Sequence, residues 1–109
     1  MKPTNILIAA ENGISIRSRE DINDAVGASL GRRLILSERD LGPDFFNLQT
    51  GLAGELIQKF VNYRVRVAIV LPAPEAYGDR FSELAYEHAT HPTVRFVRTI
   101  DEANDWLQT

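Results

Sequence analysis

Segments of two kinds alternate along the chain: short runs that are almost entirely apolar, and longer segments in which apolar residues recur at intervals. Four short runs are almost continuously apolar and rich in β-branched residues, at 5–10, 33–37, 65–71 and 94–98. Such runs are typical of strands that are covered on both faces. Between them, apolar residues recur every three or four positions, which predicts amphipathic helices over about 19–30, 51–62 and 80–88 and from Thr99 onward.

A dipeptide typical of tight turns separates the first apolar run from a segment in which apolar and polar residues alternate. Asn12-Gly13 suits the type I′ turn of a two-residue hairpin. Residues 14–18 then alternate between apolar and polar side chains, as a half-buried strand does. We therefore expect an N-terminal antiparallel hairpin in front of the first helix.

The whole pattern predicts one α/β domain over residues 1–109, with the element order ββαβαβαβα. After the hairpin, strands and helices alternate, which is typical of parallel strands joined by right-handed crossovers. We expect a single-layer mixed sheet of about five strands, mostly parallel, with about four helices. Six residues on the inferred inner faces should be buried: Leu56, Phe60, Val67, Ile69, Phe96 and Trp106.

The helix that follows Thr50 has an unusual first turn. Thr50 stands at the position of an N-cap, where its hydroxyl can accept an orphan backbone N–H. Gly51 and Gly54 follow, although glycine costs about 0.5–1 kcal/mol of helix stability relative to alanine. Two interpretations are open: a partner or ligand approaches this turn closely, or the glycines allow close internal packing. Glu55 and Lys59 are spaced as an ordinary i, i+4 surface pair.

The candidate working surface consists of Gln49, Thr50, Gly51, Gly54 and Glu55. A helix N-terminus offers free N–H groups and the positive end of the helix dipole, which suits an anion. Thr50 is accordingly a candidate phosphoacceptor or anion-site residue, and an ordinary N-cap is the alternative. Motifs for nucleotide binding, serine hydrolysis and zinc proteolysis do not occur in the sequence, so we assign no catalytic residue, metal ligand or cofactor.

The composition of the chain argues against several classes of binding partner and bears on its expected location. The net charge of −3 argues against general nucleic-acid binding. Cysteine is absent and no signal peptide is evident, so we expect a cytoplasmic location. The apolar runs are too short to span a bilayer, so no membrane association is expected. We interpret His88 and His91 as surface histidines rather than as metal ligands, because a third ligand is not evident.

The run from Phe45 to Glu55 reads Phe-Phe-Asn-Leu-Gln-Thr-Gly-Leu-Ala-Gly-Glu. It resembles the Phe-Phe-x-Leu-x-Thr-Gly-x-Ala-Gly-Glu signature of a bacterial family of small uncharacterised domains, and the resemblance extends over about 41–71. In that family the following strand continues into Gly-Asp, where this chain has Leu71-Pro72. The resemblance implies no mechanism, because the family has no established activity. Phe45 and Phe46 either anchor this loop to the core or form an exposed docking pair.

The order of elements and the segment Gln49-Thr50-Gly51-Leu52-Ala53-Gly54 also resemble the STAS domains of anti-sigma-factor antagonists. In those domains a strand leads into an Asp-Ser-Ser-Gly-Leu-Gly turn at a helix N-terminus, where a partner kinase phosphorylates one serine. Here Leu48 and Gln49 stand at the acidic and first serine positions, and only Thr50 keeps a hydroxyl. The resemblance therefore implies the fold and a binding turn, but not the phosphorylation switch.

These observations predict an uncharacterised, non-enzymatic regulatory or protein-interaction module of STAS-like type, with its working surface at residues 49–55. The alternative is a small-molecule or anion-binding domain, with or without catalysis, that uses the same helix N-terminus through Thr50 and Glu55. The expected partner is thus another protein or a small anionic ligand, and the sequence leaves the oligomeric state open. A deep polar pocket there would favour the ligand, and a flat or convex surface would favour protein docking.

Overall fold

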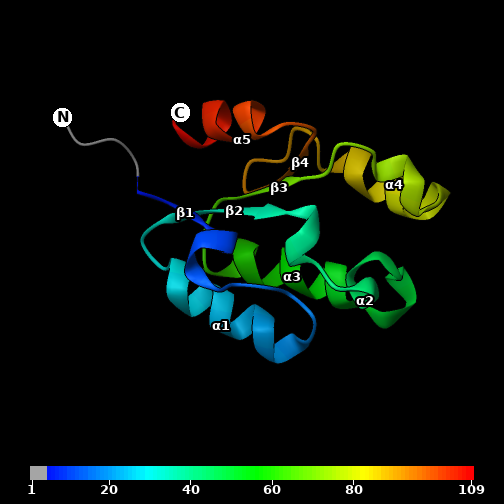
Figure 1. Ribbon diagram of the computed structural model, residues 1–109, viewed down its shortest axis with the longest axis horizontal. Helices are drawn as coiled ribbons and strands as arrows, with labels where there is room; N and C mark the ends of the chain where they lie inside the picture. Colours follow the sequence, from blue (N-terminus) through cyan, green and yellow to red (C-terminus); the bar gives the residue numbers. More distant parts are fainter. Residues whose placement is uncertain (1–4) are drawn as a thin grey trace.

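Four parallel strands form a single sheet in the computed structural model, which describes residues 5–109 (Figure 1). They are β1 (Ile6–Ile8), β2 (Arg33–Ser37), β3 (Val67–Val70) and β4 (Val94–Val97). Their spatial order is β1-β2-β3-β4, the same as their order in the chain. The register places Leu34 opposite both Leu7 and Val67, and Val94 opposite Val67. The domain is therefore α/β with a fully parallel sheet.

Five α-helices occur in residues 5–109: α1 (Arg19–Ser29), α2 (Pro43–Phe46), α3 (Leu52–Asn62), α4 (Asp79–Glu87) and α5 (Ile100–Leu107). Four of them correspond to the predicted helices, and the short α2 is additional. The hydroxyls of Ser18 and Thr99 cap α1 and α5 by accepting the N–H groups of Asp21 and Glu102. None of these helices combines the length and the apolar character that crossing a bilayer requires.

The larger part of the core lies on the α1 and α3 face of the sheet. Figure 1 shows these two helices on one side and α5 on the other. Leu56 and Phe60 of α3 pack with Val67 and Ile69 of β3, and all four are fully buried. Phe96 and Trp106 are 6% and 8% exposed, so the prediction of the six core residues is confirmed.

The other face of the sheet is covered by α5. Trp106 packs beside Ile35 and Ala68 in a second, smaller cluster. The guanidinium carbons of Arg66 and Arg95 each lie 4.5 Å from the centre of the Trp106 ring. Arg66 also donates a hydrogen bond to the Trp106 carbonyl oxygen at 3.1 Å. Cation–π contacts of this kind help to hold α5 on the sheet.

The predicted antiparallel hairpin is wrong, and with it the five-strand mixed sheet. Residues 9–12 form a 3₁₀ turn that Gly13 ends at φ 67°, while Asn12 keeps a negative φ. A type I′ turn needs a positive φ at both central residues, so Asn12-Gly13 does not reverse the chain into a hairpin. Ile16 instead forms an isolated parallel bridge with Leu41. The observed order, βαβααβαβα, lacks the second strand on which the STAS-like order depended.

The outer edge of the sheet at β4 is closed by neighbouring groups. Three N–H groups that point away from β3 each have an acceptor. Val94 donates to His91 Nδ1 at 3.2 Å, and Phe96 donates to the His88 carbonyl oxygen at 3.2 Å. Arg98 donates to Glu102 Oε1 at 2.9 Å. This edge therefore offers a further strand few free donors, which is one way proteins prevent unwanted strand pairing.

The hydrogen bonds that His91 accepts at the β4 edge predict that the stability of the domain depends on pH. His91 Nδ1 accepts N–H groups from Thr93 and Val94, which requires an unprotonated ring nitrogen. Burial, and then the positive charges of His88 and Arg95, lower the pKa of His91 below its ordinary value of 6.5. The unfolded chain therefore binds a proton at His91 more readily than the folded chain does. The stabilising contribution of His91 is complete above about pH 6.5 and is lost as the pH falls towards the folded-state pKa.

We expect urea unfolding to show a larger loss of stability between about pH 7.5 and about pH 5 for the native protein than for His91→Asn. The asparagine carbonyl can still accept an N–H but does not titrate in this range. Equal losses in the two proteins would contradict the assignment.

Candidate functional site

The candidate surface lies where a 3₁₀ turn runs directly into α3. The turn comprises Leu48–Thr50, and Gly51 both ends it and serves as the N-cap of α3. Gly51 has φ 78°, a left-handed conformation that side chains with a Cβ rarely adopt. The sharp change of direction therefore explains this glycine by backbone geometry alone. We refer to residues 49–55 as the 49–55 turn.

The Thr50 hydroxyl holds the 49–55 turn together. Its oxygen lies 2.7 Å and 2.8 Å from the carbonyl oxygens of Asp44 and Asn47, to which it can donate its proton. The same oxygen accepts the N–H of Leu52 at 3.2 Å. Thr50 thus caps the first N–H of α3 from one position before the N-cap. Its hydroxyl already has internal partners, which argues for a structural role of this side chain.

Glu55 pairs with a residue that is distant in the sequence. Its Oε1 lies 2.6 Å from Nε of Arg19, at the start of α1, and Arg19 Nη2 donates to the Thr50 carbonyl oxygen at 3.3 Å. The Glu55–Lys59 pair predicted from the i, i+4 spacing is wrong, because the ion pairs within residues 5–109 do not include it. Arg19 therefore ties the N-terminus of α1 to that of α3.

Gly54 is the part of the 49–55 turn that stays open to the outside. It is exposed, and a Cβ added there would meet no atom within 4 Å. Close packing of α3 therefore does not explain this glycine. Gln49 is exposed as well, while Thr50 and Glu55 are half-buried. The outward surface of the turn is consequently formed by Gln49, Gly51 and Gly54.

Two open hollows flank the 49–55 turn. One measures about 350 Å³ and lies between the N-termini of α1 and α3, where Arg17, Arg19 and Thr50 contribute to its wall. The other measures about 410 Å³ and lies towards α4, with Gln49 and Arg80 in its wall. The turn thus stands between two open depressions rather than inside one deep pocket.

The aromatic pair before the turn belongs mainly to the core. Phe45 is fully buried, and Phe46 is half-buried with its ring stacked on Tyr77 at 3.8 Å between centroids. Both rings also contact Phe81 of α4. Of the two interpretations of these phenylalanines, anchoring of the loop agrees with the structure.

The sequence did not point to Arg17 and Arg19 as neighbours of the 49–55 turn. They lie about thirty positions away, and only the side-by-side packing of α1 and α3 brings them here. His88 and His91 stack at 5.0 Å, away from the turn, in the segment that closes the β4 edge. Within residues 5–109, no group of three or more metal-ligating side chains is arranged to hold an ion.

These features define a small α/β domain. The helices α1 and α3, which connect its parallel strands, lie on one face of the sheet, and a helix N-terminus lies at the carboxyl end of the strands. The chain belongs to the family described as Domain of unknown function (DUF4180), which matches residues 1–107. No curated protein and no solved structure matches the chain. The family membership agrees with the expected small uncharacterised domain, and its description assigns no activity.

The contacts of Thr50 give a direct test of its structural role. Thr50→Val keeps the shape of the side chain but removes the cap and its contacts with the carbonyl groups of Asp44 and Asn47. We expect it to lower the free energy of unfolding by about 0.5–2 kcal/mol, the usual range for loss of a helix cap. Thr50→Ser keeps the hydroxyl and should retain most of the stability in the same denaturant titration. Native stability of Thr50→Val would show that the hydroxyl is not needed for the turn.

Proposed function

We propose that this domain is a non-enzymatic regulatory or protein-interaction module whose working surface is the 49–55 turn. The observation that carries the proposal is the open environment of Gly54. A glycine in the first turn of a helix lowers stability, and no internal contact accounts for this one. A partner that approaches the backbone of α3 closely would account for it.

The shape and the bonding of the turn support a protein partner. Enclosed pockets are typical of small-molecule sites, whereas this turn stands between two open hollows. The polar side chains of Thr50 and Glu55 are already bound to Asn47 and Arg19 within the domain. What remains for contact is exposed backbone and Gln49, which suit docking against another protein surface.

A second candidate is the binding of a small anion in the hollow between α1 and α3. Two arginines, Arg17 and Arg19, contribute to its wall together with two acidic residues, Glu20 and Asp44. The first turns of two helices begin there, and helix N-termini favour negative charge. Titration with inorganic phosphate tests this candidate: amide NMR shifts at Arg19 and Ala53 that saturate, and that weaken in Arg17→Gln, would favour it over protein docking. Shifts that do not saturate would remove it.

The resemblance of the domain to STAS domains is part of the same proposal. Its support is limited to the placement of a Thr-Gly-Leu-Ala-Gly turn at a helix N-terminus that follows a parallel strand. The sheet differs from the mixed sheet that we expected, and the first serine position holds Gln49. We therefore propose partner binding at this turn without phosphorylation of Thr50.

The decisive variants change Gly54. Gly54→Leu adds bulk only towards the outside, and leucine is a better helix former than glycine, so we expect a melting temperature at least as high as that of the native protein together with loss of the native binding partner in a pull-down. Gly54→Ala should keep binding and raise stability by about 0.5–1 kcal/mol, since alanine is the better helix former.

Gly27 provides the matched control. It also lies within a helix, is exposed, and has no atom within 4 Å of an added Cβ, but it belongs to α1 at a distance from the turn. Gly27→Leu should therefore keep both fold and partner. A collapsed melting transition in Gly54→Leu would assign the glycine to the fold, and retained binding would place the working surface elsewhere.

A further inference from the structure

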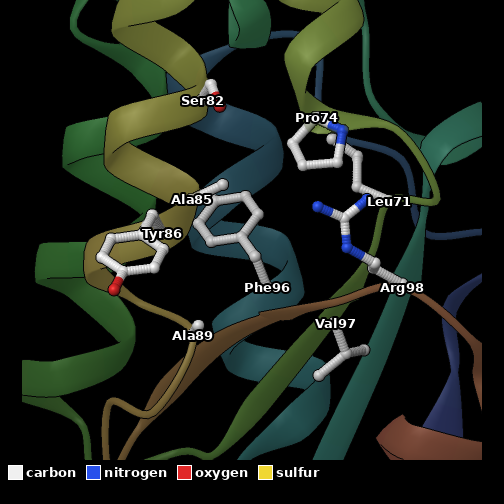
Figure 2. Close-up of a pocket in the computed structure, with 9 residues that line it drawn as sticks. All are labelled: Leu71, Pro74, Ser82, Ala85, Tyr86, Ala89, Phe96, Val97 and Arg98. Carbon is white, nitrogen blue, oxygen red and sulfur yellow. The ribbon is translucent and has the colours of Figure 1, made fainter.

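A separate cavity of about 220 Å³ lies between α4 and the carboxyl ends of β3 and β4 (Figure 2). Its wall is mostly apolar, with Leu71 at the end of β3 and Phe96 in β4 both buried. Pro74 covers one side and Val97 another. Crevices outside the carboxyl ends of parallel strands are where open α/β sheets commonly bind ligands.

Besides Tyr86, α4 and the segment after it contribute only small side chains to the wall of the cavity. Ala85 lies on α4, and Ala89 lies in the segment just after the helix, which ends at Glu87. Leucine or phenylalanine at these positions would occupy the space beside the Phe96 ring. Ser82, one turn before Ala85, adds a hydroxyl to the same wall.

Arg98 lines the cavity with a positive charge, and its side chain, 59% exposed, has unused hydrogen-bond donors. Its Nη1 donates to the Pro72 carbonyl oxygen at 2.9 Å and lies 3.6 Å from Glu75 Oε2. Within residues 5–109, the N–H groups of Nε and Nη2 have no acceptor. These two nitrogens form one edge of the planar guanidinium, the geometry that binds both oxygens of a carboxylate. Figure 2 shows the guanidinium extending towards Phe96 and Pro74.

The neighbouring backbone argues for a free acid rather than for the end of a peptide chain. A peptide that docked here as an added strand would need the outward N–H groups of β4. Those of Phe96 and Arg98 already donate to the His88 carbonyl oxygen and to Glu102 Oε1. A small molecule that uses only the side chain of Arg98 makes no such demand.

From this combination we propose that the cavity binds a small monocarboxylic acid with one ring or a short branched apolar body. The carboxylate binds the Nε and Nη2 edge of Arg98, and the apolar body packs on Phe96 beside Ala85. The volume agrees with this size, because a cavity of about 150 Å³ is enough to hold benzene. This site does not depend on the 49–55 turn or on the function proposed for it.

Benzoate is a suitable probe, and benzyl alcohol is its neutral counterpart. We expect benzoate to cause saturable amide NMR shifts at Ser82, Ala85, Phe96 and Arg98 of the ¹⁵N-labelled protein. Arg98→Gln should weaken benzoate binding about tenfold or more and leave the affinity for benzyl alcohol almost unchanged, because it removes only the charged hydrogen bonds.

Two further variants test the cavity itself. Ala89→Leu, at an exposed position, should fill part of the space and weaken both probes. Arg80→Gln changes an exposed arginine of α4 outside the cavity and should alter neither affinity. Thermal melts confirm that each variant is folded. Benzoate shifts that do not saturate, or equal benzoate affinities in the native protein and in folded Arg98→Gln, would overturn the proposal.

Discussion

The four strands are all parallel and follow one another in chain order, and this constraint determines where most other parts of the domain lie. Each crossover from one strand to the next is expected to be right-handed, so the connecting helices fall on the same face of the sheet. Helices that follow parallel strands begin at the carboxyl edge of the sheet. The N-termini of α1 and α3 therefore meet beside the 49–55 turn, and α4 starts at the same edge, beyond the second hollow.

Much of the fold could be predicted from local patterns, because buried strands and amphipathic helices carry strong signals. The range 33–37 and the end of α3 at Asn62 agree with the structure. Asn12-Gly13 shows where such reasoning fails. The dipeptide is compatible with a hairpin and also with the end of a 3₁₀ turn. The outcome depends on Ile16, which pairs with Leu41 far along the chain, and no local pattern contains that information.

The candidate site shows the same division between local and tertiary information. The capping role of the Thr50 hydroxyl depends on close neighbours, so the sequence indicated it, whereas only the structure decides between the two interpretations of Gly54. Glu55 had an apparent partner in Lys59 on the same helix, but Arg19 of α1 binds it instead. Ala85 of α4, Ala89 after it and the donors of Arg98 form a cavity only after β4 is in place beside α4. Sequence spacing alone does not bring them together.

The position of α5 has a consequence for synthesis of the protein on the ribosome. It is the helix that covers Ile35 and Ala68 on the second face of the sheet, and it comes after every strand in the chain. All four strands can leave the exit tunnel before residues 100–107 emerge to cover that face. Until then the apolar side chains on that face of the nascent sheet have no helix to cover them, and such transient exposure favours aggregation.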